Sequence, residues 1–213
     1  VQALFSFANL PYTAPTLRLL LPIGISFYTF QTVSYIIDVY RGDIPPEKHL
    51  GIFALYVVFF PQLVAGPIER AGNLLPQFAE EHRFEFARAA DGVRLMLWGF
   101  FKKIVIADNI GVMVNNIYNY PTTHSGLPLI AATVFFAIQV YCDFSGYSDI
   151  AIGSARVMGF RLMNNFNRPY AATSVADFWK RWHISLSSWF RDYLYIPLGR
   201  KHANAWWLYF TTM

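Results

Sequence analysis

The residues best suited to chemistry lie in one run, from Ser174 to Arg191. Ser174 followed three residues later by Asp177 fits a capping box and predicts the start of a helix. On one continuous helix of about 100° per residue, an aromatic face would oppose a basic face. The aromatic face would hold Phe178, Trp182, Trp189 and Tyr193, with Trp179, Leu186 and Phe190 beside it, and the basic face Lys180, Arg181, Ser188 and Arg191. This pattern is typical of a helix at a membrane interface.

His183 lies on the border between these two faces. An imidazole there could act as a general base or orient a substrate between a polar headgroup and a buried acyl chain. It could also be an interfacial side chain bonded to a neighbour. The aromatic face has the same two interpretations, because it could anchor the helix in the membrane or contact the substrate.

A second group of polar residues ends an apolar run, between Tyr141 and Asp149. Carboxylates at a membrane edge either line a wet funnel or belong to a structural polar network. Asp143 and Asp149 are six residues apart, so on a straight helix they point about 120° apart and do not form an obvious acid–base pair. Neither nearby serine lies in a nucleophile-elbow motif, which disfavours a serine hydrolase.

Other chemistries have little support in the sequence. The 5 histidines are far apart without metal-binding spacing, and the single cysteine, Cys142, excludes a thiolate cluster, so we expect no metal site. No glycine-rich loop of the kind that cradles phosphates is present. The net charge of +4 comes from scattered basic residues, which favours anionic lipid headgroups over nucleic acid as a partner.

The composition indicates that much of the protein surface faces lipid rather than water. Of 213 residues, 55% are hydrophobic and only 14% are charged. A soluble domain carries about 25% charged residues. We therefore expect a membrane protein. Together with the apolar runs and the resemblance described below, this predicts an all-α fold, a polytopic helical bundle with re-entrant or interfacial helices.

Long apolar runs indicate where this bundle crosses the membrane. They lie at residues 19–37, 50–68, 95–107, 127–152 and 205–213. In the second run, prolines predict a helix over residues 51–60 and a non-helical or re-entrant stretch over 61–67. Residues 69–94 read as an aqueous loop with an amphipathic helix. We expect four membrane segments, with another possible at residues 110–118.

Lys102 and Lys103 interrupt the run 95–107. Two adjacent lysines at a bilayer centre would be costly. Snorkelling to an interface or facing a cavity is the less costly arrangement. The ends are also unusual, since the chain begins at Val1 without a signal peptide and stops inside a new apolar run at Met213. We expect a single membrane domain over residues 1–213 that is an internal piece, incomplete at both ends.

Six stretches, in order, cover nearly the whole chain and resemble the membrane-bound O-acyltransferase (MBOAT) family. They are Gly24–Gln31, Phe60–Ile68, Asp143–Asp149, Asn165–Tyr170, Asp177–Ser187 and Trp189–Gly199. The greatest similarity is to the bacterial branch that acetylates alginate, with the teichoic-acid D-alanyl transfer branch as a near relative.

The resemblance implies a multi-pass protein of the bacterial inner membrane with a funnel across the bilayer. An acyl group, with acetyl expected, would pass from a thioester such as acetyl-CoA to hydroxyls of an extracellular polysaccharide, with periplasmic polysaccharide-acetylation proteins as partners and no tightly bound cofactor. His183 would be catalytic in a supporting role. The funnel candidates are Asp143, Ser145, Tyr147, Asp149, Asp177, Trp179, Arg181, Trp182 and Ser185.

The family's principal base is a membrane-embedded histidine downstream of the last motif present here. His202 lies in a polar turn and does not replace it. We therefore expect these residues alone to be inactive. A transporter or channel remains the alternative of another class, because proline- and glycine-broken segments with buried carboxylates could also line a path.

Overall fold

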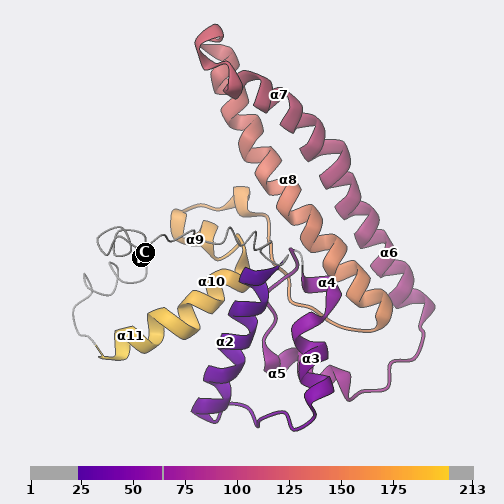
Figure 1. The fold of residues 1–213 in the computed structure, drawn as a ribbon. Helices are drawn as coiled ribbons and strands as arrows, with labels where there is room; N and C mark the ends of the chain where they lie inside the picture. The colour runs from indigo at the N-terminus through magenta and orange to yellow at the C-terminus, as the bar shows by residue number, and fades with distance from the viewer. Residues whose placement is uncertain (1–23, 64, 202–213) are drawn as a thin grey trace, which may run out of the picture.

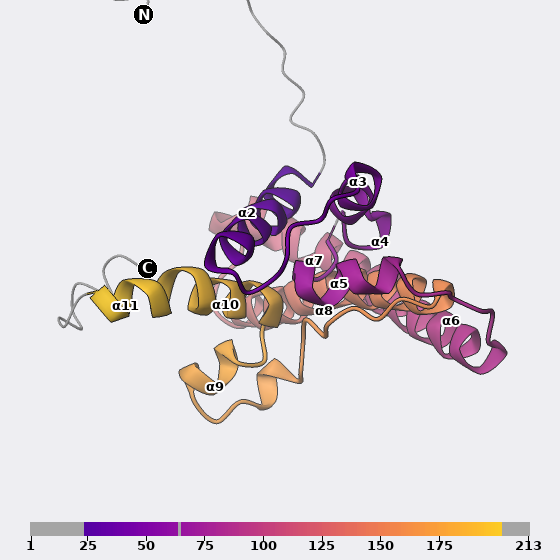
Figure 2. The ribbon, with the colours of Figure 1, turned by 90° about the horizontal axis from the view of Figure 1, so that it is seen from below.

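A computed structural model describes residues 24–63 and 65–201, and every regular element within these ranges is helical. A long helical hairpin rises from a group of shorter helices, α2 to α5, and an arm containing α10 and α11 projects to one side (Figure 1). Seen from below, α9 lies on the opposite side of α8 from α2 and α3 (Figure 2). The predicted all-α architecture is confirmed for the part of the chain described.

The hairpin consists of two helical rods. The first joins α6 (Phe86–Phe100), a π-helical segment η1 (Phe101–Ala107) and α7 (Asp108–Asn119) without a break. After the 3₁₀ turn η2 (Pro121–Thr123), α8 (Leu127–Met158) returns alongside it. The expected segments 95–107 and 110–118 are therefore parts of one rod, which begins inside the predicted aqueous loop.

Four glycines let the two rods approach closely. A Cβ atom on Gly99 would lie 2.6 Å from the carbonyl oxygen of Gly146, and one on Gly153 would lie 2.6 Å from that of Gly92. Each rod repeats its glycine after seven residues, which keeps both glycines on one helix face. Small residues at such a seam are how helices pack in lipid, where apolar burial alone provides no driving force.

The shorter helices form the base of the hairpin. They are α2 (Ile25–Arg41), α3 (Leu50–Val58), α4 (Phe60–Leu63) and α5 (Ala71–Phe78). Tyr56 and Phe59 pack with Leu74 of α5 and Ala155 of α8 in a buried apolar cluster. The helix predicted over 51–60 is close to α3, but residues 61–63 are helical rather than irregular because a new helix starts after the break at Phe59.

The arm contains η3 (Pro169–Ala171), α9 (Val175–Trp179), α10 (Ile184–Phe190), the π-helical η4 (Arg191–Tyr195) and α11 (Ile196–Lys201). Trp189 anchors it, since its Nε1 donates a hydrogen bond of 3.0 Å to the Phe30 carbonyl of α2. The prediction of one continuous helix through residues 174–193 is wrong. The chain breaks between α9 and α10, so the aromatic residues do not form one helical stripe.

One described helix, α8, is long and apolar enough to cross a membrane. Both rods of the hairpin expose large apolar side chains, such as Leu97, Val112 and Ile130. The expected segment 205–213 and the first residues of segment 19–37 lie outside the described residues, as does His202.

Candidate functional site

Residues 160–168 form a non-helical segment, here called the strap, that packs against α5 and carries one half of the candidate site. Gln77 of α5 fixes it with two hydrogen bonds, donating from Nε2 to the Arg161 carbonyl at 3.0 Å and accepting at Oε1 from the Arg161 N–H at 2.8 Å. The carboxylate of Glu69 accepts from the Met163 N–H and from Asn73 Nδ2. Burial of Glu69 raises the pKa of its carboxyl group. The strap is therefore held at two points just before Asn165.

Asn165 lies at the centre of a buried polar network and is only 1% exposed. Its Oδ1 lies 3.0 Å from His183 Nδ1 and accepts from Ser185 Oγ at 2.9 Å and from the Ser185 N–H at 3.3 Å. Its Nδ2 donates to Ser148 Oγ of α8 at 3.2 Å. One amide side chain thus joins the strap, the arm and the hairpin.

The backbone around His183 is also held by the strap. The Ile184 N–H donates to the Asn165 carbonyl at 2.9 Å, and the Asn167 N–H donates to the Arg181 carbonyl at 2.9 Å. Between these bonds His183 adopts the left-handed conformation, with φ 43° and ψ 55°. A non-glycine residue in this region is uncommon, and such conformations cluster at functional sites. The left-handed turn separates α9 from α10 and directs the imidazole toward Asn165.

The imidazole of His183 is largely buried between the strap and α8. The Phe144 ring meets it edge to face, with centroids 4.7 Å apart. Burial lowers the pKa of His183 to about 4, because the charged form loses its hydration. The ring is consequently neutral near pH 7.

Aromatic side chains surround this network on the arm side. Trp182 packs against Phe166 of the strap at 5.1 Å and against Phe178 of α9 at 5.5 Å, and its ring lies 6.2 Å from Tyr141 of α8. Trp179 is instead 54% exposed and contacts only the edge of this cluster. Of the two predicted tryptophans, Trp182 belongs to the His183 site and Trp179 faces outward.

The predicted helix start at Ser174 is confirmed, since Ser174 Oγ accepts from the Asp177 N–H at 3.1 Å. Arg181 Nε donates to Asp177 Oδ1 at 2.9 Å. This bond, together with one from the Thr173 N–H, lowers the pKa of Asp177. Asp177 and Arg181 therefore form an ion pair that stabilises the turn before His183, and each neutralises the charge of the other.

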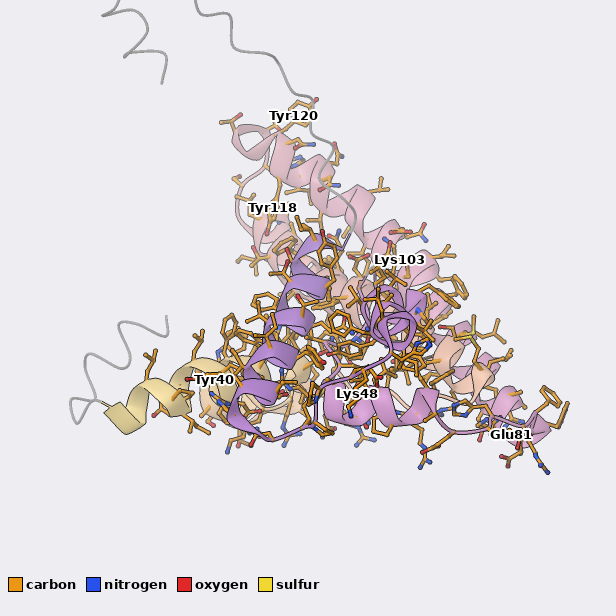
Figure 3. All side chains as sticks on the ribbon, turned by 60° about the horizontal axis from the view of Figure 1, so that its bottom comes forward. Tyr40, Lys48, Glu81, Lys103, Tyr118 and Tyr120 are labelled. Atoms are coloured by element: carbon orange, nitrogen blue, oxygen red, sulfur yellow. The ribbon has the colours of Figure 1, made fainter. Side chains whose placement is uncertain are left out.

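The remaining funnel candidates form a separate group along the hairpin. Lys102 Nζ lies 2.7 Å from Asp149 and donates to Ser145 Oγ at 3.0 Å. The next lysine, Lys103, lies 2.6 Å from Asp143 and 5.3 Å from the Tyr147 ring centroid. Figure 3 shows Lys103 part-way along the hairpin. Lys103 Nζ also lies 2.6 Å from Asp108 of α7, so both lysines are paired with carboxylates within the hairpin.

These two groups use roughly opposite sides of α8. At about 100° per residue, Gly146 and Gly153 face the first rod, whereas Phe144 and Ser148 face His183. Within the described residues, no hydrogen bond or ion pair joins the groups directly. Tyr141 is the contact between them, because Lys102 Nζ lies 5.9 Å from its ring centroid and the ring packs near Trp182.

Sequence reasoning missed Asn165, Ser148 and Phe144 as members of the His183 site. The strap sequence contains three asparagines in four residues, Asn164, Asn165 and Asn167. Only Asn165 is buried, and its burial depends on the contacts of α5 and α8 with the strap. In the sequence, the available signal is three asparagines next to Phe166. This pattern does not reveal which of the three amide side chains is buried.

Comparison with known proteins identifies the class. Residues 49–211 match the membrane-bound O-acyltransferase family. The chain belongs to this family.

Three relatives represent its bacterial members. The chain is 46% identical over 209 residues to the "Probable alginate O-acetylase AlgI" of Pseudomonas aeruginosa, with 98% of the chain and 39% of that protein covered. It is 37% identical to the peptidoglycan O-acetyltransferase of Helicobacter pylori, covering 89% of the chain and 41% of the relative. It is 32% identical to the teichoic acid D-alanyltransferase of Bacillus subtilis, covering 82% and 45%. The chain thus spans less than half the length of these relatives.

Proposed function

We propose that this chain is part of a membrane O-acyltransferase that moves an acetyl group to hydroxyls of an extracellular polysaccharide such as alginate. The observation that carries the proposal is the 46% identity to an alginate O-acetylase over 98% of the chain. Identity to a D-alanyltransferase is lower, at 32%, which makes D-alanyl transfer to teichoic acid the weaker candidate.

The reaction would be attack of a sugar hydroxyl on the carbonyl carbon of a thioester such as acetyl-CoA. The new C–O bond forms as the C–S bond breaks, the hydroxyl proton passes to a base, and the thiolate leaves and is protonated. A site shielded from water protects the thioester from hydrolysis. His183 would support this step, with the principal base supplied by a histidine outside these residues.

The setting would be the bacterial inner membrane, crossed several times, with periplasmic polysaccharide-acetylation proteins as partners. Exposed apolar side chains along both hairpin rods support a lipid or protein environment there. The neutral imidazole of His183, largely buried beside the Phe144 ring, supports a role in a site that keeps water away from the acetyl thioester. Asp177, Trp182, Arg181 and Ser185 would shape the same end of the funnel.

The test is acetylation of polysaccharide by the complete gene product in a host that lacks its own O-acetylase. His183→Asn is the variant of choice, because asparagine tolerates the left-handed backbone that alanine would strain. We expect polysaccharide acetylation to fall by at least tenfold at equal membrane abundance.

His124 provides the matched control, since it lies in the turn between α7 and α8 at the far end of the hairpin. His124→Asn should keep full acetylation. Full acetylation by His183→Asn would remove His183 from the mechanism. If the protein transfers D-alanine instead of acetate to its acceptor, the result would favour D-alanyl transfer over polysaccharide acetylation.

A further inference from the structure

The protonation state of His183 can be assigned from its neighbours. The Ser185 backbone N–H is a donor only, and it points at one atom of the Asn165 amide at 3.3 Å. That atom must therefore be the acceptor oxygen, Oδ1. The same Oδ1 lies 3.0 Å from His183 Nδ1, so this ring nitrogen must carry a hydrogen and donate it.

The alternative tautomer meets an unfavourable contact. With Nδ1 unprotonated, two lone pairs would face each other across the 3.0 Å between Nδ1 and Asn165 Oδ1. Ser185 Oγ could donate to Nδ1 only across 3.4 Å, whereas it lies 2.9 Å from Asn165 Oδ1. The shorter hydroxyl bond therefore goes to Asn165, and the Nδ1–H form of the ring is favoured.

Asn165 is itself fixed, so it can fix the imidazole. Its Nδ2 donates to Ser148 Oγ at 3.2 Å, and its backbone carbonyl accepts from the Ile184 N–H at 2.9 Å. Upstream, the strap is tied to α5 through Gln77 and Glu69. Removing the acceptor would leave the buried Ser185 N–H without a partner and the His183 Nδ1–H with only the Ser185 hydroxyl at 3.4 Å, which is costly.

We propose that Asn165 is a positioning residue that holds His183 as the neutral Nδ1–H tautomer and presents Nε2 as a hydrogen-bond acceptor. Within the described residues, Nε2 has no hydrogen-bond partner, so it is the ring atom left to meet a substrate hydroxyl or the acyl donor. This substrate role rests on the proposed function. The tautomer assignment does not, because it follows from the contacts of the ring.

The test uses the complete gene product, purified in detergent and labelled with ¹⁵N-histidine. The His183 signals are identified by their loss in His183→Asn. We expect a protonated Nδ1 and an unprotonated Nε2 at neutral pH. Observation of the Nε2–H tautomer would overturn the proposal whether or not the protein transfers acyl groups.

Two substitutions then test Asn165 as the cause. Asn165→Asp keeps the acceptor oxygen and adds a negative charge within hydrogen-bonding distance, so the His183 titration should move up by at least about one pH unit. The pH below which acyl transfer declines should move in the same direction. Asn165→Leu removes the acceptor, and we expect loss of the single tautomer and at least tenfold slower transfer.

Asn164 supplies matched controls, because it is the neighbouring asparagine of the same strap and its side chain is exposed. Asn164→Asp and Asn164→Leu should change neither the His183 titration nor the rate. If Asn165→Leu does not fold, Asn165→Asp decides alone. An unchanged His183 titration in Asn165→Asp would overturn the proposal, whereas absence of any acyl transfer by the wild-type protein would count only against the proposed function.

Discussion

The Lys102 ammonium group lies 2.7 Å from the Asp149 carboxylate, inside the apolar hairpin formed by η1 and α8. The side chain of Lys102 is only 9% exposed, and Ser145 Oγ accepts a second hydrogen bond from it. A buried charge requires this kind of compensation, because neither water nor lipid solvates it there. The pair therefore joins the two rods where a lone lysine would separate them.

Breaking this pair should be strongly destabilising. Lys102→Met leaves Asp149 partly buried without its partner, for an expected loss of about 3 kcal/mol. Thermal unfolding of the complete protein in detergent measures it. Arg94→Met is the control, because the Arg94–Asp91 pair is exposed at 78% and 57% and should contribute close to nothing. Equal losses in both variants would contradict the role of burial.

The sequence identified Lys102 and the α8 carboxylates separately as costly groups, but it did not pair them. Pairing depends on the register of two antiparallel rods, and that register is fixed by contacts between Gly99 and Gly146 that no local pattern reveals. The π-helical turn η1 also rotates both lysines relative to a regular helix. The apolar runs and the family resemblance could therefore predict the all-α class, whereas the ion pairs required the packed hairpin.

The glycine seam gives a second prediction. Gly99→Ala places a methyl group 2.6 Å from the Gly146 carbonyl oxygen, so the rods must separate, at a cost of about 1–3 kcal/mol. Gly72→Ala in α5 is the matched control, because its Cβ would meet only an Ile44 methyl group at 3.4 Å. Alanine should even favour that helix by up to about 1 kcal/mol. Denaturation in detergent distinguishes the two, and a stable Gly99→Ala protein would show that the rods do not rely on this contact.

The arm shows where local patterns work and where they fail. The capping box at Ser174 predicted the start of α9 correctly, because capping depends on residues within one turn. The break at His183 was missed, since its left-handed backbone is imposed by the strap from 18 residues away through Asn165. The candidate site was therefore predicted at the level of His183, Trp182 and Ser185, but without the amide that organises them.

The strap itself should depend on Gln77. Gln77→Leu has nearly the same shape but leaves the N–H and carbonyl groups of Arg161 without partners, at a cost of about 1–3 kcal/mol. Because the strap carries Asn165, acyl transfer should also slow. Glu81→Gln, at an exposed position, is the control and should change neither quantity. If Gln77→Leu is less stable but transfers acyl groups at the normal rate, the anchoring of the strap by Gln77 is not needed to position Asn165.

The burial of His183 predicts how stability depends on pH. The folded-state pKa is about 4, below the value of about 6.5 expected in an unfolded chain. Between these values the unfolded state binds the additional proton, so stability is present above about pH 6.5 and falls as the pH drops toward 4. The His183→Asn variant has no imidazole to protonate, so it should lack this loss of stability at low pH. We expect the loss to be about 2 kcal/mol, because the ring remains partly exposed. Unfolding of the two proteins measured across this range provides the comparison. Above about pH 7 the difference between their free energies of unfolding should be constant. If the two free energies instead change in parallel down to pH 4, the imidazole titrates with its ordinary pKa. That result would contradict its burial between Phe144 and the strap.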